Sequence, residues 1–348
     1  MKKTIILSLA VLALAASCGR TKTTSQHEAD QRSFNAWVKV QKELHPEYLW
    51  QPTELGSWLL EETVGTGEAI TGEEDTLYVR VNYILSTLKG DISSTTYAKV
   101  AQQLGTYSEN SFYGPAVLYL KGQYAGLEEL LTGMRSGGRR KAAIPGWLMT
   151  YKRYDTPEKY LNDSTNTTPG IYDVELVDHF SNTDKWELDS IGRYLVRHFP
   201  KRYGTDPVKA VGDSSGAHGF YYIQSKAPSS ATVLKDTAVY INYIGRLLDG
   251  SVFDTNVRDT AMRHGIYKSN GDYSPVYIKY GDDWSEIRMG TSGSSVVKGF
   301  ALTLSKMGPF VEGTGIFYSP LGYSYSGSGS TIPGYSPLRF DISIVKQK

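Results

Sequence analysis

The stretch from Tyr240 to Asn256 reads YINYIGRLLDGSVFDTN. An apolar run rich in β-branched and aromatic residues leads into a Leu-Asp-Gly turn, which is typical of a β-hairpin. A weaker copy between Val79 and Thr96 reads VRVNYILSTLKGDISSTT. Both copies place Asn-Tyr-Ile before the turn, but only the later copy follows the turn with Phe253 and Asp254. The chain therefore contains one hairpin design twice, with a Phe-Asp pair in one version alone.

Other elements around the two hairpins recur in the same order. Apolar residues at helical spacing predict an amphipathic helix ahead of each hairpin and a shorter one after it. Alternating apolar residues at the end of each copy predict a closing strand. The expected helices are 31–44 and 126–134 in the first copy and 183–199 and 298–307 in the second, and the closing strands are 171–178 and 338–345. This pattern indicates a duplicated domain, because solenoid repeats span only about 20–50 residues.

The fold class and the domain ranges follow from this repeat. Runs of antiparallel strands with one embedded helix predict an α+β fold. We expect a first domain at 31–180, a helical linker at 181–218 and a second domain at 219–348.

The amino terminus carries the features of an export signal. Lys2 and Lys3 precede an apolar run at 5–14, and small residues at 15–17 lead to Cys18. The run is too short to cross a bilayer, so it fits a cleaved signal peptide. A small-residue end directly before cysteine resembles the lipobox of bacterial lipoproteins.

Processing of that kind would remove residues 1–17 and attach lipid to Cys18, the only cysteine in the chain. The membrane would then be a partner through the lipid anchor, with residues 18–30 as a flexible tether. This places the protein extracytoplasmically in the cell envelope, at the outer membrane or cell surface. An ordinary secretory signal with an incidental cysteine is the alternative.

The charge balance excludes one large class of partner. The chain has 37 Lys plus Arg and 36 Asp plus Glu among 348 residues. A nucleic-acid-binding protein needs a basic face, so we expect no nucleic-acid partner.

The second copy resembles the FKBP-type peptidyl-prolyl isomerases. The family's motifs occur in order as the hairpin at 240–256, VVKGFALTLSKM from Val296, the tyrosine loop from Ser319, Ile332-Pro333 and the closing strand with Phe340-Asp341. The resemblance covers about 219–345 and implies that each domain is a curved antiparallel sheet wrapped on a short helix, preceded by extra N-terminal helices.

The resemblance also assigns roles to individual residues. It implies that Asp254 is the polar group beside the twisting amide and that Tyr325 donates a hydrogen bond to a substrate carbonyl. Phe253 is grouped with these two catalytic residues and also lines the proline pocket. The other residues implied to line that pocket are Tyr243, Val296, Val297, Phe300, Ile332 and Phe340. Phe300 stands where the family usually has tryptophan, which keeps an aromatic floor but makes it smaller. Barrel core packing is the alternative role for these aromatic residues.

The first copy departs from the family at the site. Tyr83 and Gly126 match Tyr243 and Gly299, but Ser93 and Ser94 stand at the Phe-Asp positions. Leu127 replaces the aromatic residue at the pocket floor, and the later loop keeps only Ile144-Pro145 and Trp147. We therefore expect the first domain to be catalytically silent.

Other short motifs do not indicate a further chemistry. Gly212 to Gly216 reads GDSSG, but it lacks the strand before and the helix after that a hydrolase elbow requires. The six histidines have no metal-ligand spacing, and GTSGSS at 290–295 lacks the lysine of a P-loop. No cofactor and no metal are expected.

The resulting prediction is an isomerase, with activity in the second domain, that helps extracytoplasmic proteins fold. Its partners would be proline-containing or unfolded polypeptide segments. Two alternatives stay open. One is a non-catalytic chaperone or peptide-binding lipoprotein, and the other is a structural component of an envelope or motility complex.

Overall fold

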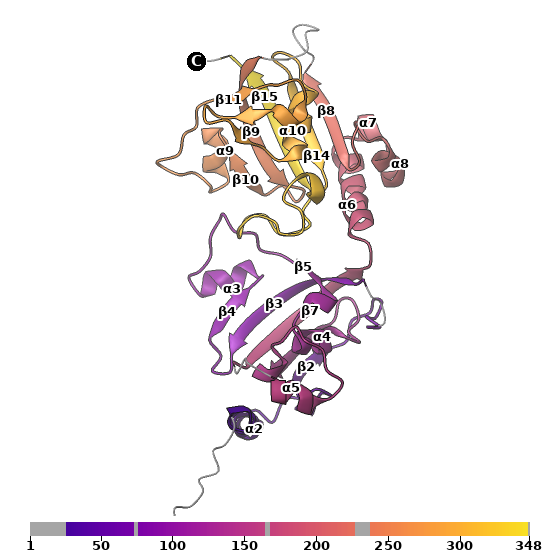
Figure 1. Ribbon diagram of the computed structural model, residues 1–348, viewed down its shortest axis with the longest axis vertical. Helices are drawn as coiled ribbons and strands as arrows, with labels where there is room; N and C mark the ends of the chain where they lie inside the picture. Colours follow the sequence, from indigo (N-terminus) through magenta and orange to yellow (C-terminus); the bar gives the residue numbers. More distant parts are fainter. Residues whose placement is uncertain (1–25, 73–75, 164–167, 227–236, 347–348) are drawn as a thin grey trace, which may run out of the picture.

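The computed structural model describes residues 26–72, 76–163, 168–226 and 237–346. Within these ranges the chain is a mixture of α and β structure with nine α-helices and two antiparallel sheets (Figure 1). The predicted signal peptide, Cys18 and most of the predicted tether lie outside the described residues. In those ranges no helix is both long enough and apolar enough to cross a membrane.

The first sheet is built from the strands that surround the weaker hairpin copy. They are β1 (Gln51–Pro52), β2 (Trp58–Thr63), β3 (Tyr78–Thr87), β4 (Ile92–Thr95), β5 (Ala116–Tyr119), β6 (Arg139–Ile144) and β7 (Gly170–Phe180). Their order is β1-β2-β6-β7-β3-β4, and β5 also pairs with β3. The predicted hairpin is therefore β3 and β4, and the predicted closing strand is β7.

The second sheet repeats this order with strands from the later part of the chain. They are β8 (Phe220–Lys226), β9 (Ala238–Leu247), β10 (Val252–Thr255), β11 (Val276–Lys279), β12 (Arg288–Met289), β13 (Ser294–Ser295), β14 (Glu312–Phe317) and β15 (Leu338–Val345). The path β8-β14-β15-β9 corresponds to β2-β6-β7-β3, with β10 and β11 both on β9. The shared strand order is the structural counterpart of the sequence repeat.

The helices include the predicted amphipathic segments and several short additions. They are α2 (Gln26–Leu44), α3 (Ala98–Gln103), α4 (Ala125–Leu131), α5 (Pro157–Asp163), α6 (Thr183–His198), α7 (Pro200–Tyr203), α8 (Pro207–Gly212), α9 (Arg258–Arg263) and α10 (Lys298–Ser305). In Figure 1, α6, α7 and α8 lie beside β8. Asn182 caps α6, because its side chain accepts a hydrogen bond from the Lys185 N–H.

Both faces of the second sheet are covered. The alternating closing strand β15 buries Leu338, Phe340, Ile342 and Ile344 together with Phe300 and Leu304 of α10. On the opposite face, Ile191 and Leu195 of α6 pack with Tyr221 and Ile316. The linker helix α6 thereby shields a face that would otherwise expose apolar surface.

A glycine begins the buried face of the short helix in each half. A Cβ atom on Gly299 would lie 2.3 Å from the Phe317 ring, and one on Gly126 would lie 2.3 Å from Cγ2 of Ile144. Contacts that short are sterically forbidden, so both helices need glycine to approach their strand. Ile144, at the end of β6, therefore occupies the position in the first half that Phe317, at the end of β14, occupies in the second.

This pairing corrects one sequence interpretation. Ile144-Pro145 is not the counterpart of Ile332-Pro333, because it begins the loop after β6 while Ile332 lies near the end of the loop after β14. The sequence comparison failed there because the two loops differ in content: the first contains α5, and the second contains a short turn stabilised by Ser328 and Ile332.

The two halves meet through loops and aromatic rings. The Phe112 N–H donates to the Ser330 carbonyl at 2.8 Å, and the Ser111 and Ser330 hydroxyls lie 3.0 Å apart. The rings of Tyr78 and Tyr335 pack edge to face at 5.4 Å. The β4-to-β5 segment of the first half therefore reaches the loop between β14 and β15 of the second half.

Candidate functional site

An aromatic cluster surrounds Phe340 on the helix-facing side of the second sheet. The Phe340 ring lies 5.0 Å from Phe300 and 5.5 Å from Phe253, both edge to face. Tyr243 completes the group, 5.8 Å from Phe300 and 6.4 Å from Phe340. Four of the residues predicted for the proline site are thus brought together from β9, β10, α10 and β15.

The polar edge of this cluster is a tyrosine–carboxylate pair. The Tyr243 hydroxyl donates to Oδ2 of Asp254 at 2.8 Å. Burial raises the pKa of Tyr243 well above its usual range, and the Asp254 charge raises it further. Tyr243 therefore stays a neutral donor, and Asp254 lies exposed at the rim of an otherwise apolar group.

Hydrogen bonds between the backbone and the side chains of Thr255 and Asn256 hold this pair in place. Asn256 is 3% exposed, and its Oδ1 accepts from the Tyr243 N–H at 2.8 Å while its Nδ2 donates to the Ile241 and Ser274 carbonyls. The Thr255 hydroxyl donates to the Tyr243 carbonyl at 2.6 Å. The Thr-Asn pair of the opening motif thus fixes the strand that carries Tyr243, a role that the sequence interpretation missed.

The remaining predicted pocket residues divide into two groups. Val296 and Val297 are half-buried against the same hydrophobic cluster, and Ile332 is buried in it. Tyr325, however, is 71% exposed. The pKa of Tyr335, which packs on Tyr78 of the first half, is raised mainly by burial and to a smaller extent by the neighbouring Tyr325. Tyr325 therefore lies at the surface near the contact between the halves.

Tyr323 is the tyrosine of this loop that lies beside the site. It is half-buried against the hydrophobic core of the second half, which includes Phe300 and Phe340. Its pKa is raised by burial and then by the Asp254 charge. The two tyrosines are separated by Ser324, which adopts a positive φ of 55° and whose N–H donates to the Ser319 carbonyl. That tight turn sends the side chains to different places, which a Tyr-Ser-Tyr sequence does not reveal.

The first half presents a different surface at the equivalent position. Ser94 lies opposite Leu85 in the first sheet, just as Asp254 lies opposite Gly245 in the second. The first half therefore has a serine hydroxyl at the position where the second half has the Asp254 carboxylate. Leu127 occupies the position of Phe300. The result is a small apolar cavity of about 180 Å³, lined by Tyr83, Leu118, Tyr124, Leu127 and Tyr172 among others.

Phe112 is a further residue that sequence reasoning did not connect with the site. It comes from the first half but packs against the hydrophobic core of the second half, which contains Ile332, Phe300 and Phe340. A Cβ atom on Gly265, in the loop after α9, would collide with Glu109 of the same first-half segment. This segment therefore touches two loops of the second half.

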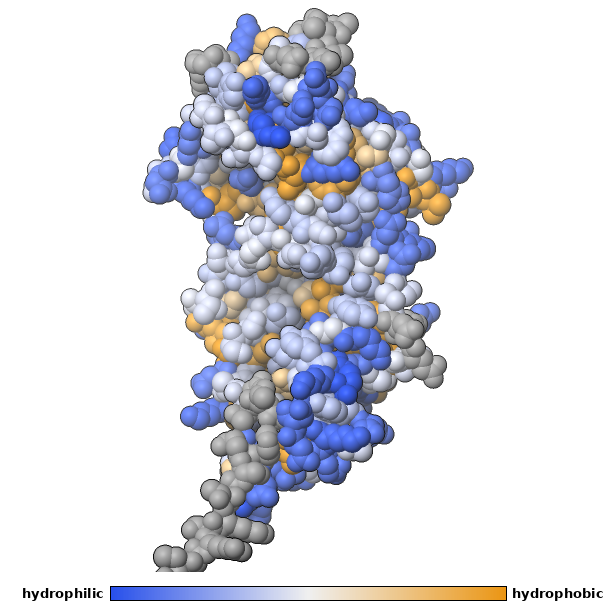
Figure 2. Space-filling model, viewed as in Figure 1, coloured by the Kyte–Doolittle hydropathy of each residue, from blue (hydrophilic) through white to orange (hydrophobic). Residues whose placement is uncertain are grey.

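Two further observations concern the molecular surface and the residue types that bind metal ions. On the face shown in Figure 2, hydrophobic residues reach the surface in separate groups surrounded by hydrophilic ones. In the part of the chain that the structure describes, no three His, Cys, Asp or Glu side chains gather in a way that could hold a metal ion.

Comparison with known proteins gives structural similarities without sequence matches. No protein-family model matches the chain, and no curated protein matches it. The three FKBP domains of wheat FKBP73 are similar with 13% identity and a TM-score of 0.28, covering 83% of this chain and 93% of that one.

Two bacterial structures show comparable similarity. FkpA from Escherichia coli has 22% identity and a TM-score of 0.29, covering 52% of this chain and 74% of that one. A peptidyl-prolyl cis-trans isomerase from Pseudomonas syringae has 17% identity and a TM-score of 0.29, covering 48% of this chain and 96% of that one. These TM-scores are low, so the chain's own residues carry the functional interpretation.

Proposed function

We propose that the second half of the chain, 219–348, is a peptidyl-prolyl cis-trans isomerase with an FKBP-like fold, in which the sheet wraps on α10. The observation that carries the proposal is the hydrogen bond between Tyr243 and Asp254 at the rim of the aromatic cluster around Phe340. The Asp254 carboxylate is exposed and therefore hydrated, but its orientation is held by the Tyr243 hydroxyl, which belongs to the aromatic cluster itself.

The chemistry of prolyl isomerisation suits such a site. The barrier of about 18–20 kcal/mol comes from amide resonance that is lost when the bond twists. No covalent bond to the chain is needed, so the task is to hold the proline ring and to favour the twisted amide. A twisted amide is less polar than a planar one, and the rings of Phe253, Phe300 and Phe340 would stabilise it by excluding water.

Individual residues take separate roles in this proposal. Phe340 and Phe300 would contact the proline ring, and Val297 and Ile332 would flank it. Asp254 would lie beside the twisting amide, with its orientation fixed by Tyr243. Tyr323 would donate to a substrate carbonyl, in place of the Tyr325 that the sequence suggested.

The first half, 31–180, would be a related domain without turnover. Ser93 and Ser94 remove both the aromatic group and the carboxylate from the rim, so an amide held there would lack the polar group. We further propose that Cys18 carries a lipid anchor and that the protein assists folding of polypeptides outside the cytoplasm.

An exchange measurement on the full chain tests the isomerase proposal. We expect it to accelerate cis-to-trans exchange in an Ala-Leu-Pro-Phe-type peptide, measured by NMR exchange spectroscopy. Tyr243→Phe removes one hydrogen bond to a charged group and should slow catalysis by about tenfold or more. Absence of any acceleration above the uncatalysed rate would refute the proposal and leave the non-catalytic binding function.

A further inference from the structure

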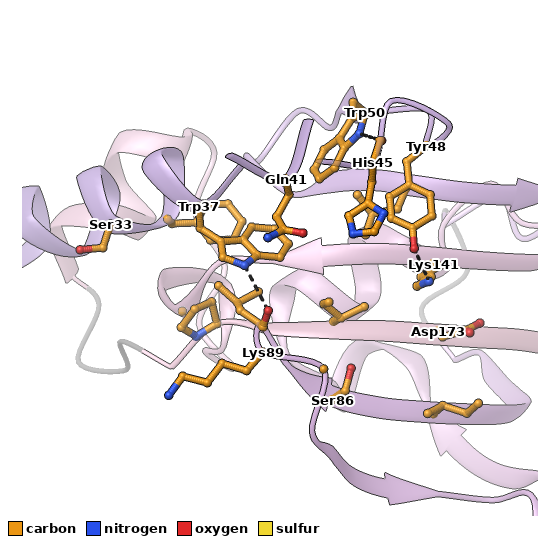
Figure 3. Close-up of a pocket in the computed structure, with 18 of the residues that line it drawn as sticks. Ser33, Trp37, Gln41, His45, Tyr48, Trp50, Ser86, Lys89, Lys141 and Asp173 are labelled. Carbon is orange, nitrogen blue, oxygen red and sulfur yellow. Dashed lines mark hydrogen bonds between the residues drawn. The ribbon is translucent and has the colours of Figure 1, made fainter. Parts of the chain in front are cut away.

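A large cavity lies in the first half, away from the proposed proline site. It has a volume of about 950 Å³ and is formed by α2, the segment after it, the outer face of β3 and β7, and the turn between β3 and β4 (Figure 3). Ligand-binding cavities in proteins span about 300–1,000 Å³, so this one is large enough for several side chains. Nothing in the proposed isomerase mechanism uses it.

Its walls present partly exposed apolar groups. Trp37 comes from α2, and Tyr48 and Trp50 come from the segment that follows. The opposite wall consists of branched aliphatic side chains of the sheet's outer face and turn: Ile84, Leu88, Ile92 and Ile171. Most of these residues are only half-buried, so a ligand with apolar groups would gain by covering them.

Most polar groups in the walls already have intramolecular partners. The Trp37 and Trp50 indole N–H groups donate to the Leu88 and His45 carbonyls at 3.1 and 2.8 Å. The Lys141 ammonium contacts Glu61 and the Tyr48 hydroxyl. The Ser33 and Ser86 hydroxyls also line the cavity and have no hydrogen-bond partner in the described part of the chain.

Gln41 is a further and more informative exception. Its amide lies between Trp37 and His45 in Figure 3. Within the described ranges, the Gln41 side chain forms no hydrogen bond with another residue. A primary amide is both donor and acceptor, so it complements a peptide unit. A hydrocarbon chain would bury the amide without a partner, which is unfavourable.

Lys89 offers a polypeptide ligand a second polar contact. Its ammonium lies at the turn between β3 and β4, and it forms no ion pair with the described part of the chain. It could donate to a main-chain carbonyl or to a carboxylate of the ligand. The combination of aromatic walls, one free amide and one free cation matches a polypeptide better than a lipid tail.

We propose that this helix–sheet cavity, formed by α2 and the outer face of the first sheet, binds an extended polypeptide segment with aromatic or aliphatic side chains. The site is independent of proline and of the second half. It would give the chain a second point of contact with an unfolded protein, even if the isomerase proposal failed.

The test uses the full chain and a fluorescein-labelled, proline-free peptide in which Leu and Phe alternate with Ser. Binding is followed by fluorescence anisotropy. Gln41→Leu should weaken binding about tenfold, because one hydrogen-bond partner of the peptide is lost. Gln103→Leu, the same change at an exposed position of α3 outside the cavity, should leave the affinity at the wild-type value.

A second variant and two competitors complete the design. Ile84→Glu places a charge against the apolar wall and should abolish binding; if it fails to fold by circular dichroism, Gln41→Leu alone decides. Palmitate and maltohexaose should not displace the peptide. Unchanged affinity in Gln41→Leu, displacement by either competitor, or loss of binding in Asp254→Ala would overturn the proposal, the last by placing the peptide in the second half.

Discussion

Glu187 and Ser319, 132 positions apart in the chain, are joined by two hydrogen bonds of 2.6 Å. The Ser319 N–H donates to one carboxylate oxygen of Glu187, and the Ser319 hydroxyl donates to the other. Glu187 is 1% exposed and Ser319 is 2% exposed. Helix α6 thereby fixes the start of the loop that carries Tyr323, so the linker takes part in shaping the proposed site.

The first prediction concerns this connection. Glu187→Ala leaves two buried donors of Ser319 without an acceptor and should lower the free energy of unfolding by about 1–3 kcal/mol. Glu187→Gln keeps an acceptor oxygen and should cost much less. Urea titration of both variants measures the difference, and equal losses in the two would show that the hydrogen bonds contribute little.

The same residue predicts a pH dependence. Burial raises the pKa of Glu187 above its ordinary value of about 4.5. A raised carboxyl pKa means that the folded state binds the proton more tightly than the unfolded state, so this group's contribution is greatest below about 4.5 and falls as the pH rises through the folded pKa. The stability of Glu187→Gln relative to wild type should therefore increase from about pH 4 to pH 7. A constant difference across that range would contradict the assignment.

Two neighbouring tyrosines of β8 allow the effect of a buried hydroxyl on protein stability to be compared with and without a hydrogen bond. The Tyr221 hydroxyl donates to the Val211 carbonyl at 2.8 Å, whereas the buried Tyr222 hydroxyl has no partner in the described residues. Tyr221→Phe should destabilise the protein by about 1 kcal/mol, while Tyr222→Phe should be neutral or stabilising because an unpaired buried hydroxyl is removed. Thermal unfolding of the two variants compares them directly, and a reversed order would refute the hydrogen-bond assignment.

The glycines that begin α4 and α10 should be intolerant of substitution. Gly126→Ala and Gly299→Ala each place a methyl group 2.3 Å from a buried side chain of the facing strand. Overpacking of this kind costs about 1–3 kcal/mol, despite the better helix propensity of alanine. Gly137→Ala, where a Cβ meets no atom within 4 Å, tests the separate effect of a positive φ of 81°. Stabilisation by Gly299→Ala would mean that the helix lies further from β14.

The tyrosine loop offers a direct test of the proposed role of Tyr323. Tyr323→Phe should reduce the isomerisation rate about tenfold, because the hydroxyl near Asp254 is removed. Tyr325→Phe, two positions later and 71% exposed, should leave the rate unchanged. The opposite pattern in the exchange assay would restore the sequence-based choice of Tyr325.

Particular residues show what the sequence could and could not predict. The alternation of β15 was readable because side chains of a strand point to opposite faces, so Phe340 was expected inside. Likewise, the Leu-Asp-Gly turn fixed the hairpin that carries Asp254. The sequence did not show which tyrosine of the loop lies near Asp254, because the two side chains are separated by a tight turn with a positive φ at Ser324.

Residues that act across long sequence distances were also missed. Gln41 and Glu187 lie in predicted helices, but helical periodicity does not show what a polar side chain faces. Phe112 lies in a loop without a motif and packs against the distant second half. The short strands β12 and β13 have only two residues each, too few for a periodic signal. Local pattern thus predicted the framework, while tertiary packing decided which side chains meet.

The internal repeat provides the most direct test of the central claim. Asp254 and Ser94 occupy equivalent positions in the two halves, opposite Gly245 and Leu85. We predict that Asp254→Ala lowers prolyl isomerisation by the full chain at least tenfold, whereas Ser94→Ala in the same assay leaves the rate unchanged. An equal rate in wild type and Asp254→Ala would contradict the assignment of the activity to the second half.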